Sequence, residues 1–133
     1  MKAGFKGNLL DTSTALLAVE DPAKLSLGIQ KAVIAGPNFL SVVAYWEVML
    51  KSMKGQLDIG DPRAWWFDTL DQRAATPLPL RPQHIAAIRG LLPIHNDPFD
   101  RALIAQAIVE NLTFVTTDST VALYESNGFR VKS

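Results

Sequence analysis

The feature that most constrains this chain is an alternation of short β-favouring runs with helical patterns. Asn8-Leu9-Leu10 is an apolar run that ends at Asp11-Thr12-Ser13, a polar cluster suited to capping a following helix. Residues 38–43 and 113–117 form two further β-favouring runs. After the second run, apolar residues recur three and four positions apart, at Trp46, Met49, Leu50 and Met53. Strands that alternate with helices predict a mostly parallel sheet covered on both faces.

The clearest helix signal begins at Asp97. Asp97 suits the N-cap position, Pro98 suits the first helical position, and Asp100 falls in the first turn. Asn111 suits the end of this helix. One apolar face runs between these ends, at Leu103, Ile104, Ala107 and Ile108.

Length and composition indicate a single globular domain. The 133 residues predict one domain over 1–133, which buries about two-thirds of the surface that the unfolded chain exposes. Pieces around Leu78 and residues 129–131 predict short edge strands. The chain has no cysteine, which excludes a disulfide scaffold, a thiolate zinc site and a cysteine nucleophile. Its 13 basic and 13 acidic residues cancel, so it lacks the basic surplus typical of general nucleic-acid binding.

The sequence gives no sign of a membrane segment. Residues 1–6 lack the apolar core of a signal peptide. The most apolar run, Phe39 to Trp46, is far shorter than the roughly 20 residues that cross a bilayer. We expect a cytoplasmic protein that does not contact membranes.

Acidic residues stand where the predicted sheet would carry a site. Open α/β sheets place their sites beyond the carboxyl ends of the strands. Asp11 and Asp118 each follow an apolar strand directly. Glu47 lies in the helix after another strand, and Asp100 lies in the first turn of the helix that leads into residues 113–117. We therefore expect all four carboxylates at one end of the sheet.

Carboxylates gathered in one cleft indicate a divalent metal. Two like charges ~4 Å apart cost about 4 kcal/mol at an effective dielectric of ~20, so the acids either take protons or surround a cation. Oxygen ligands alone favour Mg²⁺ or Mn²⁺ over zinc. A bound ion of this kind activates water for phosphodiester hydrolysis, and two ions stabilise both the attacking and the leaving oxygens.

Each acid also has a simpler interpretation. Asp11 and Asp118 suit helix caps, and Asp100 complements a helix dipole. Glu47 has Lys51 one helical turn on, the spacing of a favourable surface pair. The joint placement of the four acids, and no single one of them, favours the metal site.

Other polar and aromatic residues give weaker signals. His95 is a candidate for orienting a water or a phosphate, but a packed or exposed loop histidine is the favoured interpretation. Arg101 is either a contact to a phosphate or a partner's carboxylate, or a solvated helix residue. Asp97 is a second candidate for the acid of its helix, and His84 is expected on a helix surface. Core or interface positions are expected for Trp46, Trp65 and Trp66.

Four segments resemble the PIN-domain family, and most closely its VapC-type toxins. The resemblance extends from Leu9 to about Tyr124, and residues 97–106 are its most specific part. The segments are Leu9-Leu10-Asp11-Thr12-Ser13, residues 41–47 around Glu47, residues 97–107 around Asp100, and Phe114-Val115-Thr116-Thr117-Asp118.

The resemblance implies a Mg²⁺- or Mn²⁺-dependent endoribonuclease with a three-layer α/β/α fold and a short, mostly parallel sheet. Thr116 or Thr117 would support the site. The acids of the family's site would correspond, in order, to Asp11, Glu47, Asp100 and Asp118. Some members carry a further acid after the fourth, where this chain has Ser119 and Thr120, which leaves one or two metals open.

The resemblance also implies partners. Toxins of this kind are neutralised by a cognate antitoxin, which often places a basic residue in the acidic site. They commonly form homodimers and cut structured or translation-linked RNAs, including tRNA. An alternative is a catalytically idle PIN-like module that binds RNA or protein. An Asp-x-Asp phosphatase is disfavoured, because Ser13 stands where its second aspartate would be.

Overall fold

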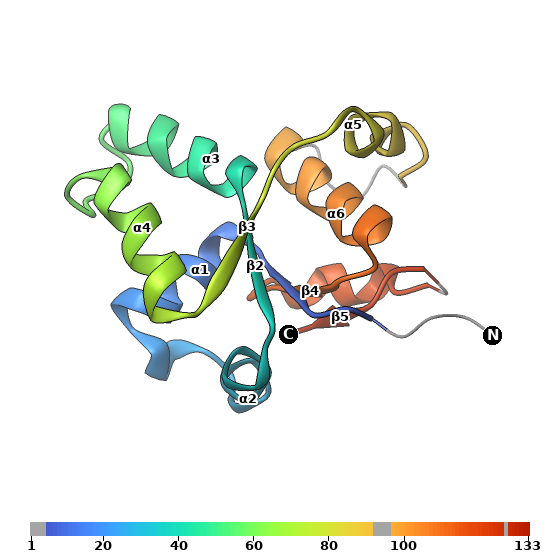
Figure 1. Ribbon diagram of the computed structural model, residues 1–133, viewed down its shortest axis with the longest axis horizontal. Coiled ribbons are helices and arrows are strands. Elements are labelled where there is room, and N and C mark those ends of the chain that lie inside the picture. The colour runs from blue at the N-terminus through green and yellow to red at the C-terminus, as the bar shows by residue number, and fades with distance from the viewer. Residues whose placement is uncertain (1–4, 92–96, 127) are drawn as a thin grey trace.

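A five-stranded parallel sheet forms the centre of the computed structural model, which describes residues 5–91, 97–126 and 128–133 (Figure 1). The strand order is β3-β2-β1-β4-β5, and all the paired strands run parallel. The predicted mostly parallel sheet is therefore confirmed. The strands are β1 (Asn8–Leu10), β2 (Asn38–Ser41), β3 (Ala75–Leu78), β4 (Thr113–Val115) and β5 (Val131–Lys132).

Helices connect the strands and cover the sheet, which gives the expected three layers. The α-helices are α1 (Thr12–Glu20), α2 (Leu27–Ala35), α3 (Val42–Met53), α4 (Pro62–Gln72), α5 (Pro82–Ile88) and α6 (Pro98–Glu110). Two 3₁₀ helices complete the described chain, η1 (Pro22–Lys24) and η2 (Ser119–Tyr124). None of these helices has the length and apolar character needed to span a membrane, within the residues that the structure describes.

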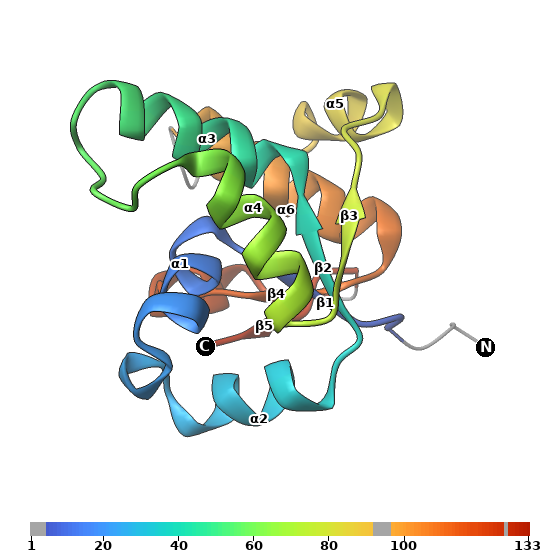
Figure 2. The same ribbon diagram turned by 60° about the vertical axis from the view of Figure 1, so that its left-hand side comes forward.

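Two separate cores lie on the two faces of the sheet, because successive strand side chains point to opposite faces. Leu9 packs into one core with Phe114 and the apolar residues of α6 and η2. Leu10 packs into the other with Val115 and residues of α1 to α4. Figures 1 and 2 show α5 and α6 on one side of the strands and α1, α2 and α4 on the other.

Polar side chains fix where the helices begin and end. The carboxylates of Asp11, Asp97 and Asp118 cap α1, α6 and η2 respectively by accepting backbone N–H groups. Asn111 ends α6 with φ of 56°, the left-handed conformation that asparagine tolerates. The helix ends predicted at Asp97 and Asn111 are thus confirmed.

The strands are shorter than the sequence pattern suggested. β2 ends at Ser41, because the Ser41 hydroxyl accepts the N–H of Val43 and starts α3 two residues before the end of the predicted run. β4 ends at Val115, two residues before the end of the predicted run, and the next residue, Thr116, donates its hydroxyl to Asp11. Early termination of both strands brings polar residues to the edge of the sheet.

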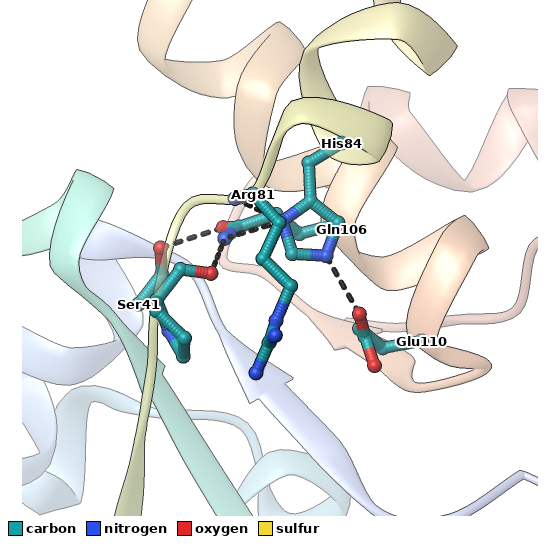
Figure 3. A network of polar contacts seen from close by, with 6 residues as sticks. Ser41, Arg81, His84, Gln106 and Glu110 are labelled. Atoms are coloured by element: carbon teal, nitrogen blue, oxygen red, sulfur yellow. Dashed lines mark hydrogen bonds and ion pairs between the residues drawn. The ribbon is translucent and has the colours of Figure 1, made fainter.

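A buried polar network joins the end of β2 to α5 and α6 (Figure 3). Ser41 Oγ donates to Gln106 Oε1 at 2.6 Å, and Gln106 Nε2 donates to the Pro79 carbonyl at 3.2 Å. His84 accepts the Arg81 N–H at Nδ1, at 3.0 Å, so its ring proton lies on Nε2, which contacts Glu110 Oε2 at 2.7 Å. The network holds α5 against α6 and fixes the strand end from which α3 departs.

The expected surface position of His84 is wrong. Its side chain is fully buried, because both ring nitrogens have partners inside the network. The three tryptophans differ in burial. Trp65 and Trp66 are in the core as expected, whereas Trp46 is 55% exposed.

Candidate active site

The carboxyl ends of three neighbouring strands place the candidate site. β1 lies between β2 and β4, so residues after Leu10, Ser41 and Val115 meet at one edge. The Asp11 N–H donates to the Val115 carbonyl at 2.9 Å, which continues the β1–β4 pairing by one step. Asp11 is thereby held at the strand end and not in a mobile loop.

Asp11 carries a buried carboxylate, and only 5% of the residue is exposed. Its Oδ1 accepts the Thr14 N–H at 2.8 Å, and its Oδ2 accepts the Thr116 hydroxyl at 2.6 Å. Burial raises the pKa of Asp11, and the negative charge of Glu47 raises this pKa further, although the hydrogen bonds oppose both effects. The carboxylate is therefore costly to ionise without a cation nearby.

Glu47 is the second buried carboxylate at this edge, 4% exposed. Its Oε1 accepts the Thr12 hydroxyl at 2.6 Å, and its Oε2 pairs with Lys51 Nζ at 2.6 Å. The pair with Lys51 exists as the helical spacing suggested. It is no ordinary surface pair, because the carboxylate lies inside the protein.

Thr116 links Asp11 to Asp118. Its buried hydroxyl donates to Asp11 and accepts the Asp118 N–H at 3.0 Å. Asp118 is exposed, and its Oδ1 accepts the N–H and hydroxyl of Thr120 at 3.0 and 2.6 Å. Of the two candidate threonines, Thr116 is the one that contacts the acids, whereas Thr117 is exposed.

The start of α6 approaches this edge from the side of α3. Trp46 and Phe99 meet edge to face, with ring centroids 5.0 Å apart, and each directly precedes a candidate acid in sequence. The charges of Asp97 and Asp100 both raise the pKa of Lys51, after the larger effect of its bond to Glu47. Asp100 therefore contributes its charge to the field around the Glu47–Lys51 pair.

The acids form a connected set but not a closed metal cage. Asp11 joins Asp118 through Thr116, and Glu47 acts electrostatically on Asp11. Among the described residues, no three acidic or histidine side chains stand close enough together to hold a metal ion. The donors are all carboxylate and hydroxyl oxygens, which fits the chemistry of Mg²⁺ or Mn²⁺. Binding would require these side chains to draw together.

Thr12 has a role that sequence reasoning missed, since it was read only as part of a cap. Thr12 is the first residue of α1, directly after Asp11, and its hydroxyl donates to Glu47 on α3. Its place beside a candidate acid is the sequence signal that could have indicated this role. Arg101 donates from Nη2 to the Ile88 carbonyl at 3.2 Å and so ties α6 to the end of α5. His95 lies outside the described residues.

The fold and this edge together define an α/β domain with carboxylates at the carboxyl ends of its central parallel strands. A model of the PIN domain matches residues 9–125, and the chain therefore belongs to the PIN-domain family. This finding confirms the resemblance carried by the sequence segments. The comparison with curated protein sequences gave no match.

Solved structures share the fold at low sequence identity. The chain is similar to VapBC2 from Rickettsia felis, bound to a DNA fragment from its promoter, with a TM-score of 0.67, 13% identity, and coverage of 94% of this chain and 96% of that one. It is also similar to DNA-bound VapBC from Salmonella typhimurium, with a TM-score of 0.65, 16% identity, and coverage of 94% of this chain and 96% of that one. A third similar structure is VapBC-5 from Mycobacterium tuberculosis, with a TM-score of 0.56, 22% identity, and coverage of 93% of this chain and 95% of that one. These likenesses cover 93–94% of this chain.

Proposed function

We propose that this PIN domain is a metal-dependent endoribonuclease of the VapC toxin type. The observation that carries the proposal is the buried carboxylate of Asp11, at the edge where Glu47 and Asp118 also lie. Burial raises the pKa of this carboxylate. The N-cap bond and the Thr116 hydrogen bond offset only part of the cost of burying this charge, and a cation would offset the rest. Membership of the PIN-domain family supports nuclease chemistry as the function of that cation.

The proposed ligands are the four acids predicted from the sequence. Asp11, Asp100 and Asp118 would hold Mg²⁺ or Mn²⁺ directly, and Glu47 would hold the ion or steer the attacking water. Thr116 and Thr12 orient Asp11 and Glu47 by donating hydroxyl hydrogen bonds at 2.6 Å. When bound, such an ion supplies Lewis-acid stabilisation of phosphate charge and a water of lowered pKa.

The protein's own contribution is to hold Asp11 in place before an ion binds. The N-cap bond fixes Asp11 Oδ1 against the first turn of α1, so this carboxylate has little rotational freedom to lose on binding. The strand ends bring Thr116 and Asp118 to the same edge. The substrate phosphodiester is negatively charged, and it would meet this acidic edge favourably only with the cation present.

A cognate antitoxin is the proposed protein partner. The support is that the similar structures include a toxin–antitoxin complex from Klebsiella pneumoniae and, in VapBC-5, a member of the VapBC family of toxin–antitoxin systems. An acidic edge is a natural docking point for a basic side chain of such a partner. A homodimer, a tRNA substrate and a cytoplasmic location stay predictions from the sequence.

The direct test is cleavage of a total RNA pool by purified protein free of antitoxin. We expect cutting with Mg²⁺ or Mn²⁺ and none with chelator. Asp11→Asn and Asp100→Asn should each lose activity by about 100-fold or more, the scale of removing a group that stabilises transition-state charge. Asp61→Asn is the matched control, because Asp61 is an exposed helix cap on α4 that asparagine can replace.

Equal activity in Asp11→Asn and wild type would contradict the assignment. The idle binding module is the second candidate, and one observation favours it: Lys51 already balances the charge of Glu47. Folded protein that binds RNA but cuts none of the pool, with either metal, would favour that module.

A further inference from the structure

The Glu47–Lys51 pair joins a buried group to a half-exposed one. The Glu47 side chain is 5% exposed and the Lys51 side chain 43%, with 2.6 Å between Oε2 and Nζ. The other carboxylate oxygen, Oε1, is taken by the Thr12 hydroxyl. The ammonium group of Lys51 therefore binds Oε2, the Glu47 oxygen that Thr12 does not contact.

Lys51 also lies in the field of the other acids. Its hydrogen bond to Glu47 raises its pKa most, and the negative charges of Glu47, Asp97 and Asp100 raise it further. These acids come from two elements, α3 and the start of α6. The ammonium group is thus surrounded by negative charge from α3 and from the start of α6, and the contact that carries the argument is its 2.6 Å pair with Glu47.

We propose that Lys51 is a positioning residue that serves as the built-in counter-ion of the acidic edge and competes with the divalent ion for Glu47. The inference rests on the proposed metal site and deepens it. Without a bound ion, Lys51 balances and orients Glu47, which would otherwise be a buried and unpaired charge. A divalent ion held by Glu47 would be repelled by the neighbouring ammonium group, so Lys51 would set the affinity for the metal.

The test is calorimetric titration of Mn²⁺ into the metal-free protein, in the absence of RNA. We expect Lys51→Met and Lys51→Gln to bind Mn²⁺ about tenfold more tightly than wild type, a change of about 1.4 kcal/mol. Lys51→Arg keeps the charge and should bind as wild type does. Lys54→Met is the matched control, because Lys54 is an exposed residue that ends the same helix.

Thermal melts show whether each variant is folded, and Lys51→Gln retains a hydrogen-bond donor for Glu47 if Lys51→Met does not fold. Unchanged or weaker Mn²⁺ binding in the uncharged variants, with Asp11-dependent binding in wild type, would overturn the role of Lys51 and leave the metal site intact. A wild type that binds no Mn²⁺, or that binds it equally well as Asp11→Asn, would overturn both proposals.

Discussion

Asp11 and Glu47 are the two buried carboxylates at the candidate site. Each is held by a threonine hydroxyl at 2.6 Å, Thr116 for Asp11 and Thr12 for Glu47. Glu47 also has a cationic partner, because Lys51 pairs with it. Within the part of the chain that the structure describes, Asp11 has hydrogen-bond partners only, and its raised pKa shows that these bonds do not fully offset burial.

Asp11→Asn should stabilise the metal-free protein at neutral pH. Asparagine caps a helix as well as aspartate does. The folded-state pKa of Asp11 lies above its ordinary value of 3.8, so the folded protein binds more protons than the unfolded chain between these two values. Wild-type stability is therefore lost as pH rises through that window, and the variant escapes this loss.

Urea unfolding in chelator across acidic and neutral pH measures this difference. The stability advantage of Asp11→Asn should grow as pH rises and then level off. A variant that is much less stable than wild type at neutral pH would show that the carboxylate is structural.

Thr116→Val should destabilise the protein, because it removes the donor to Asp11 and the acceptor of the Asp118 N–H. We expect a loss of about 1–3 kcal/mol, the cost of leaving buried polar groups unsatisfied. Thr117→Val is the control, because Thr117 is exposed. Chemical denaturation of both variants tests this, and equal stabilities would show that Thr116 does not support the site.

At the level of elements, the sequence predicted the parts whose signals are local. The caps at Asp11 and Asp97 and the end at Asn111 depend on residues within one turn of each boundary, so they could be read directly. The burial of His84 could not, because its partner Glu110 is 26 residues away. The same reason hid the bond between Thr12 and Glu47, 35 residues apart.

The polar network under α5 should stabilise the start of α3. Gln106→Leu leaves the Ser41 hydroxyl and the Pro79 carbonyl without their partner in a buried place. We expect a destabilisation of about 1–3 kcal/mol. Gln83→Leu, at an exposed position of α5, serves as the control. Matching melting temperatures for the two variants would contradict a stabilising role for the network.

For the whole molecule, the order of strands decides which distant residues meet. The alternation of strands and helices predicted a parallel sheet, and a parallel sheet collects its strand ends at one edge. That argument brought Asp11, Glu47 and Asp118 to the same edge. It could not give side-chain rotamers, so it did not show that Lys51 pairs with Glu47. Nor did it show that the acids among the described residues stop short of a closed set of metal ligands.

The central claim is that the acids at this edge draw together around one divalent site. A crystal structure of the protein with Mn²⁺, phased so that anomalous scattering locates the metal, tests it most directly. We expect a peak in contact with the carboxylate of Asp11 and with at least one further acid among Glu47, Asp100 and Asp118. A Mn²⁺ peak elsewhere, with these carboxylates arranged as they are without metal, would contradict the account.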